Sequence, residues 1–171
     1  ENLRGRVRGA FEHPASLRLE GLSPFGAPGF VLVAQPSAAV LLLPRERRIV
    51  SDANAKELLG ELAGVTLGPA DFGALLTGCL FPDPHPRAAR SYRNGRIGIE
   101  LESGATIYLQ MINDVPVITA GTRDGLIVQY RDYVRGLPRR IRVQSLDVGQ
   151  VKTDLTVILS QVNINTNLNP D

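Results

Sequence analysis

The side chains best suited to covalent or metal chemistry are the single cysteine and the two histidines. A thiolate becomes a nucleophile beside a base, and histidine also ligates metals. Cys79 has no second cysteine and no histidine near it in sequence, so we expect a small buried apolar residue, with a free thiol as the alternative. His13 and His85 each stand beside a proline, without a second ligand at metal spacing, and we expect both to be exposed and inert.

Recognised catalytic motifs are missing from the sequence. It contains no glycine-rich phosphate loop, no GxSxG nucleophile turn and no HExxH zinc motif. We therefore expect a protein that is not an enzyme, uses no cofactor and holds no metal. The aspartates that we expect as caps and turn residues instead are Asp52, Asp71, Asp124 and Asp132.

Arginines form two concentrations of positive charge. Such groups usually mark a solvated strand face or turn, and the alternative is contact with anionic lipid headgroups, worth about 1 kcal/mol per basic residue. The formal net charge is only +2, so we do not expect a nucleic-acid partner. The two groups are Arg87, Arg90, Arg93 and Arg96, and Arg131, Arg135, Arg139, Arg140 and Arg142.

The turn Ser23-Pro24-Phe25-Gly26 carries a large apolar side chain where turns normally carry polar ones. Turn tips lie at the surface of a protein. Phe25, between Pro24 and Gly26, is therefore a candidate contact with a membrane or an apolar partner. A residue packed under the edge of the sheet explains it equally well.

The composition limits the class of protein. With 43% hydrophobic and 21% charged residues, the 171 residues are typical of one globular domain with its own core. One cysteine excludes an internal disulfide, and no apolar run approaches the roughly 20 residues that span a bilayer. The chain begins at Glu1 without a signal peptide, so we expect a mature or trimmed form.

Strands dominate the predicted secondary structure. Turn signals such as Asn113-Asp114 and Asp124-Gly125 separate apolar runs at intervals of roughly 8–12 residues, which is typical of antiparallel meanders. Residues 6–12 can supply one further strand. The other predicted strands cover 17–22, 30–34, 40–43, 97–101, 105–111, 115–120, 126–133, 140–143 and 155–164.

Two short helices interrupt these strands. Asn54 is suited to cap the first helix, with Glu57 three residues later in the capping-box position. Pro69 is suited to the first turn of the second helix, and the prolines at 82–86 predict a stiff connector back to the strands. The apolar faces of the helices are Leu58, Leu59 and Leu62, and Phe72, Leu75 and Leu76.

Together these elements predict an α+β fold, with one antiparallel sheet and the helices on one face. The runs at 30–34 and 40–43 are apolar on both faces, whereas a strand with one face in water alternates. Both faces are therefore expected to be covered. An ordinary core beneath helices is one way to do this, and a curved sheet enclosing an apolar cavity is the other.

Three stretches of the chain resemble the bacterial lipoprotein localisation family, which includes the outer-membrane receptor LolB and the carrier LolA. Residues 17–36 are similar to its alternating strand, its Pro-Leu-Gly-type turn and the apolar strand that follows. Residues 55–79 are similar to its helical lid. Residues 127–143 (IVQYRDYVRGLPRRIRV) are similar to a later pair of its strands.

The resemblance implies a single domain over residues 1–171, built as a strongly curved antiparallel sheet, or open half β-barrel. Short helices at about 54–79 would form a lid over an apolar cavity that holds acyl chains. In the receptor, an exposed apolar residue of the turn assists delivery into the membrane, and that role carries over to Phe25. The implied cavity lining is Leu19, Phe30, Leu32, Leu41, Leu58, Leu62, Phe72 and Leu75.

The implied function is to bind lipids or lipoproteins in the periplasm and deliver them to the outer membrane. The expected partners of this monomer are acyl chains of lipoproteins or other lipids, a carrier protein and the outer-membrane surface. The receptor's lipid-bearing N-terminal cysteine has no counterpart here, so we expect this chain to lack the anchor segment, with lipid anchoring through an N-terminal cysteine missing from this sequence as the alternative. The alternative is an envelope scaffold or partner-binding module, in which the same residues form a plain core.

Overall fold

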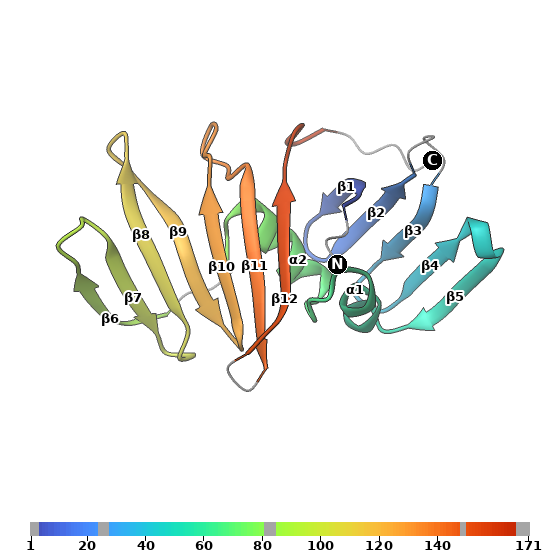
Figure 1. The fold of residues 1–171 in the computed structure, drawn as a ribbon, viewed down its shortest axis with the longest axis horizontal. Coiled ribbons are helices and arrows are strands. Elements are labelled where there is room, and N and C mark those ends of the chain that lie inside the picture. Colours follow the sequence, from blue (N-terminus) through green and yellow to red (C-terminus); the bar gives the residue numbers. More distant parts are fainter. Residues whose placement is uncertain (1–3, 24–27, 81–84, 148–149, 167–171) are drawn as a thin grey trace. The chain divides into compact units, whose positions relative to one another are not determined.

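The computed structural model describes residues 4–23, 28–80, 85–147 and 150–166. The chain divides into two compact units, Glu1–Gly73 with Asn165–Asp171 and Ala74–Ile164. Within the described ranges each unit carries its own antiparallel sheet (Figure 1). The prediction of one sheet is therefore wrong, because the two helices separate the strands into two sets that do not pair with each other.

The first unit is a five-stranded meander in which each strand pairs with the next along the chain. Its strands are β1 (Arg6–Glu12), β2 (Ser16–Leu22), β3 (Pro28–Ala34), β4 (Ala39–Leu43) and β5 (Arg48–Ala53), with the 3₁₀ turn η1 (Pro44–Glu46) before β5. Helix α1 (Ala55–Ala63) follows, and α2 (Pro69–Thr77) begins in this unit and ends in the second.

The second unit is a seven-stranded antiparallel meander with β12 and β6 at its edges. Its strands are β6 (Pro86–Ser91), β7 (Ile97–Leu101), β8 (Thr106–Ile112), β9 (Val115–Arg123), β10 (Leu126–Arg131), β11 (Arg140–Asp147) and β12 (Gln150–Ile158). Asn113, Asp114, Asp124 and Gly125 all have positive φ, which confirms two of the predicted hairpin turns.

Neither β5 nor β6 was predicted, and β12 ends earlier than expected. Strand β6 begins with Pro86 and every residue in it is exposed, so it lacks the apolar pattern that marks a strand. Proline is tolerated there because β6 is an edge strand. The predicted proline connector thus includes the first residue of a strand.

Both predicted helices are confirmed, together with their end signals. The Asn54 side chain caps α1 by accepting a hydrogen bond from the backbone N–H of Lys56 at 2.9 Å. Pro69 is the first residue of α2. The helix ends at Gly78, whose φ is 81°, while the N–H of Cys79 donates to the Ala74 carbonyl at 2.9 Å. Among the described residues, neither helix is long and apolar enough to cross a membrane.

Strands β3 and β4 each have one buried and one exposed face. Leu32 and Leu41 expose 0% and 5% of their surface, whereas Val33 and Val40 expose 38% and 41%. The expectation that both faces of these apolar strands are covered is therefore wrong. Neither sheet is closed or strongly curled, so the half-barrel implied by the resemblance stays a prediction.

Candidate functional site

The candidate site is the inner face of the first unit, which we define by Leu17, Leu19, Leu32 and Leu41 on β2, β3 and β4. The strand register places Leu19 beside Leu32 and Leu32 beside Leu41. Side chains of directly opposed residues share one face of a sheet. Each of these leucines exposes 8% of its surface or less. The four leucines therefore form a continuous aliphatic surface on the inner face, which we call the floor.

Helix α1 and the part of α2 that belongs to the first unit, up to Gly73, pack against strands of this unit. Helix α1 lies against β4, and its Leu58 and Leu59 expose 4% and 0% of their surface. At the edge strand β1, the Phe72 ring of α2 packs against the Phe11 ring, with centroids 6.1 Å apart. Apolar side chains from both helices thus face an apolar sheet, as the prediction of helices on one face requires.

Because Gly21 has no side chain, the aromatic ring of Phe30 can lie directly over its backbone. Gly21 of β2 lies directly opposite Phe30 of β3, and a Cβ at Gly21 would overlap the Phe30 ring. Phe30 is half-buried, so part of its ring remains accessible. It lies close in sequence to the turn with Pro24, Phe25 and Gly26, which falls outside the described residues.

The predicted lining residues differ in exposure. Five of them (Leu19, Leu32, Leu41, Leu58 and Phe72) expose between 0% and 8% of their surface. Leu62 on α1 exposes 36%. Leu75, at 3%, belongs to the second unit, so it is not part of this site as described. The five buried side chains have almost no room for water against them, and an acyl chain can reach the floor only if a helix moves away.

A second cluster, in the second unit, was not predicted as a group. Tyr130 exposes 2% of its surface, and its hydroxyl has no hydrogen-bond partner within the described structure. Burial raises the pKa of Tyr130, and proximity to Tyr133 and Cys79 raises it further. The Tyr133 hydroxyl donates a hydrogen bond to the Ile118 carbonyl, and burial raises its pKa to about 12. These two phenols therefore hold their protons at neutral pH.

Cys79 is exposed, so the expectation of a small buried apolar residue is wrong. Its neighbour Gly78 lies close to Pro138 and to the Tyr133 hydroxyl, at 3.2 Å and 3.7 Å from a Cβ built on the glycine. The cluster joins the end of α2 to the β10–β11 connection. Sequence reasoning missed it because Gly78 and Cys79 are far in the chain from Tyr130, Tyr133 and Pro138.

The second unit also has a surface hollow of about 720 Å³ between the β7–β8 and β9–β10 turns. Its lining includes His85, Glu102 and Asp124. Asp124 is already paired with Arg123 at 3.2 Å. His13 and His85 are both exposed. In the part of the chain that the structure describes, no three metal-ligating side chains gather at one point.

Several of the predicted arginines pair with acidic side chains on the second unit. Arg140 donates to Asp132 at 3.0 Å, and Arg142 donates to Asp154 at 2.8 Å. The Arg142 hydrogen bond lowers the pKa of Asp154. Arg96 lies over the Tyr108 ring, 5.6 Å from its centroid. Exposed pairs of this kind are what a solvated strand face produces.

A scan against protein families and a sequence comparison with curated proteins both find no match for this chain. Any function must therefore be argued from the residues themselves and from how the fold arranges them.

Proposed function

We propose that this protein binds the acyl chains of lipids or lipoproteins against the inner face of its first unit and releases them into a membrane. The observation that carries the proposal is the buried aliphatic face of β2, β3 and β4, against which the short helix α1 packs with Leu58 and Leu59. Binding alone performs such a function, without covalent chemistry. The strong curvature and the lid role of the helices belong to this proposal.

The free energy gained by burying an acyl chain on the floor is comparable to that gained by packing the helix side chains there. Short helices depend on packing for their stability. Burying Leu58, Leu59 and Phe72 contributes about 1.5–3 kcal/mol each. A chain of about 16 carbons gains about 0.8 kcal/mol per buried methylene, or roughly 12 kcal/mol. A bound chain can therefore replace the contacts that hold the helices on the floor.

Release completes the proposed function. The membrane interior is still more apolar than a protein site. Transfer of the acyl chain from the protein to the membrane therefore lowers its free energy, once a path exists. Phe25, placed at a turn tip by the sequence, would provide that path, with the periplasmic face of the outer membrane as the destination. A carrier protein that supplies the cargo and a monomeric state are further parts of this proposal.

One observation favours a second function, that of an envelope scaffold or partner-binding module. The five buried lining residues are covered almost completely by other atoms of the protein. A floor filled in this way needs no ligand for its stability. In that case the helices are permanent parts of the core, and the first unit presents only its surface to partners.

The two functions differ in the uptake of a fluorescent acyl probe. We expect saturable binding at micromolar concentration or below, and displacement of the probe by a triacylated lipopeptide. A folded protein that takes up no probe would contradict acyl binding and leave the scaffold as the function.

Leu62 offers a test of where the probe binds. It lies on α1 and exposes 36% of its surface, so Leu62→Gln should leave the melting temperature nearly unchanged. A polar amide at the rim of the site should weaken probe binding by about three- to tenfold. The neighbouring exposed residue on the same helix gives the matched control, Glu61→Gln. Equal affinities of the two variants would place the probe elsewhere.

Phe25 offers a test of the release step. Phe25→Glu should slow transfer of bound lipopeptide to liposomes severalfold, because a carboxylate at the turn tip cannot enter the membrane interface. Probe affinity and chemical stability should stay close to those of the original protein. A loss of several kcal/mol in the free energy of unfolding would instead identify Phe25 as a core residue.

A further inference from the structure

The outer face of the first unit, opposite the inner face, is apolar where β3, β4 and β5 lie side by side. The register places Val31 opposite Leu42, and Leu42 opposite Ile49, so these three form one row across the sheet. Val33 and Val40 form the next row. We call these five residues the outer patch: Val31, Val33, Val40, Leu42 and Ile49.

The outer patch is accessible to solvent. Val33, Val40, Leu42 and Ile49 expose 38%, 41%, 37% and 65% of their surface. A sheet with one face in water normally carries polar side chains there. Strand β11 of the second unit follows that pattern, since it alternates buried Ile141 with exposed Arg142. A contiguous aliphatic surface of this kind marks a place of interaction.

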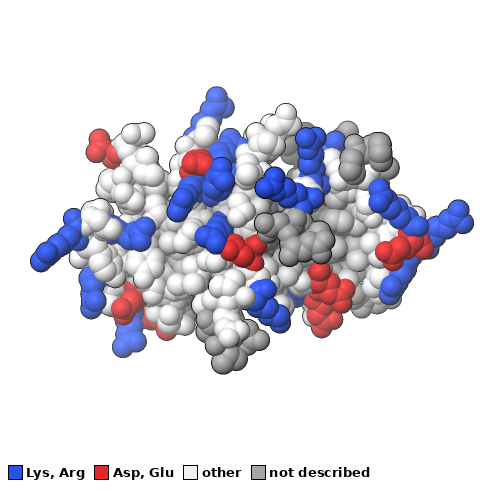
Figure 2. All heavy atoms as spheres, in the orientation of Figure 1, with Lys and Arg blue, Asp and Glu red and all other residues white. Residues whose placement is uncertain are grey.

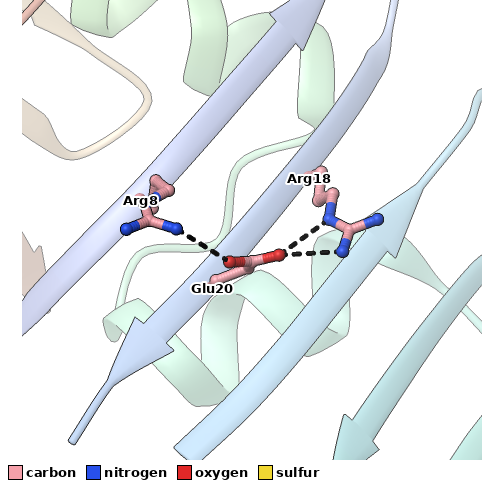
Figure 3. A network of polar contacts seen from close by, with 3 residues as sticks. All are labelled: Arg8, Arg18 and Glu20. Atoms are coloured by element: carbon pink, nitrogen blue, oxygen red, sulfur yellow. Dashed lines mark hydrogen bonds and ion pairs between the residues drawn. The ribbon is translucent and has the colours of Figure 1, made fainter. Parts of the chain in front are cut away.

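Positive charge borders the outer patch on β1 and β2. Glu20 lies opposite Val31, and Arg18 lies opposite Val33, on the same face of the sheet. Figure 3 shows Glu20 held between Arg18, at 2.8 Å, and Arg8, at 4.0 Å. One carboxylate thus meets two guanidinium groups, so this cluster keeps a net positive charge.

The opposite border, at the turn between β4 and β5, is also basic. Arg45, Arg47 and Arg48 are all exposed. None of them takes part in an ion pair within the described structure, and Glu46 is the single acidic residue between them. Basic side chains predominate at this end of the first unit in Figure 2. The aliphatic rows therefore lie between two groups of arginines.

We propose that the outer patch lies against an anionic lipid surface. Its aliphatic side chains would enter the layer between headgroups and acyl chains, and the bordering arginines would contact lipid phosphates. The backbones of β3 and β4 are hydrogen-bonded to strands on both sides, so contact with lipid leaves none of their amides unsatisfied. This surface is separate from the inner face and requires no acyl chain to be bound there.

Charge favours lipid over a second copy of the chain. In a symmetric dimer through this face, the same basic borders would meet each other, which disfavours association. An anionic membrane instead offers a flat, deformable surface of opposite charge. Binding should accordingly weaken as salt is raised.

The test compares sedimentation of the protein with vesicles of pure phosphatidylcholine and of equimolar phosphatidylcholine and phosphatidylglycerol. We expect binding to the anionic vesicles. Leu42→Gln combined with Ile49→Gln should lower that binding about tenfold or more, without unfolding the protein. The matched control is Met111→Gln with Val115→Gln on β8 and β9, which expose 51% and 56% of their surface. Equal loss in both double variants would overturn the proposal.

The charged border is tested in the same way. Arg45→Gln with Arg48→Gln should weaken binding to the anionic vesicles by about 30-fold, and the control, Arg87→Gln with Arg90→Gln on β6, should have little effect. A protein that forms a dimer which Leu42→Gln and Ile49→Gln convert to a monomer would overturn the lipid assignment in favour of a second copy. Acyl-probe affinity should be unchanged in every one of these variants, which separates this result from failure of the proposed function.

Discussion

Replacing Leu32 with alanine should lower the free energy of unfolding by about 3 kcal/mol, within the roughly 2–5 kcal/mol found for buried leucines. Leu32 exposes 0% of its surface and lies between Leu19 and Leu41 in the centre of the inner face. Truncation removes three carbons and leaves a hole that rigid strands on both sides cannot fill. Urea unfolding followed by circular dichroism measures the change.

The adjacent residue provides a matched control. Val33 exposes 38% of its surface on the outer face, so Val33→Ala should cost less than about 1 kcal/mol. A larger loss in Val33→Ala than in Leu32→Ala would mean that the register of β3 is shifted by one residue, because such a shift moves every side chain to the other face.

The Leu32 variant also bears on the proposed function. If the inner face already encloses open space, removal of the leucine side chain creates little new cavity, and the loss approaches the transfer term alone, about 2 kcal/mol. If the floor is filled, the hole adds to the loss. Added acyl probe should then restore stability in Leu32→Ala more than in Val33→Ala, since only the first variant gains space on that face.

The sequence predicted best where the local pattern and the tertiary environment agree. Helix α1 has a capping side chain at Asn54 and leucines at helical spacing, and both features appear in the structure. The alternating strand β2 likewise buries Leu17 and Leu19. Such signals depend on a few neighbouring residues, so the sequence contains them in full.

The same reasoning failed where apolar residues stay exposed. The runs in β3 and β4 suggested two covered faces, yet Val33 and Leu42 are open to solvent. A hydropathy pattern reports what a side chain prefers and not what covers it. The apolar excess on these strands is, in our proposal, the part of the first unit that meets lipid.

The edge strands and the choice of strand partners were also not predicted from the sequence. Strand β5 lies at the edge of its sheet and has only Ile49 and Val50 as large apolar residues, so it lacks the apolar run by which strands were predicted. The division into two sheets depends on which strands pair, and no local motif encodes that choice. For the candidate site, the sequence identified the floor residues but did not distinguish a filled floor from an open one.

Raising the pH above about 10 should destabilise the protein, and Tyr130→Phe should remove much of that effect. The ordinary pKa of tyrosine is 10.0, and burial raises that of folded Tyr130 well above it. Below pH 10 both states keep the proton, so this group adds no pH dependence. Above it the unfolded chain loses the proton while the folded chain retains it, which favours unfolding by about 1.4 kcal/mol per pH unit.

Tyr133 adds to the same trend over a narrower range. Its folded pKa is about 12, so its contribution develops above pH 10 and levels off near pH 12. Because Tyr133 is only half-buried, solvent reduces its share. The free energy of unfolding from urea titrations at pH 8 to pH 12 should therefore stay level up to about pH 10 and fall steeply above it in the original protein. In Tyr130→Phe the fall should be smaller by about 1.4 kcal/mol per pH unit.

Tyr130→Phe should also be at least as stable as the original protein at neutral pH. The Tyr130 hydroxyl is buried without a hydrogen-bond partner in the described structure, so its removal relieves a cost of about 1 kcal/mol. The matched control is Tyr92→Phe, since Tyr92 exposes 41% of its surface. A Tyr130→Phe protein that is markedly less stable at neutral pH would mean that the hydroxyl is satisfied after all.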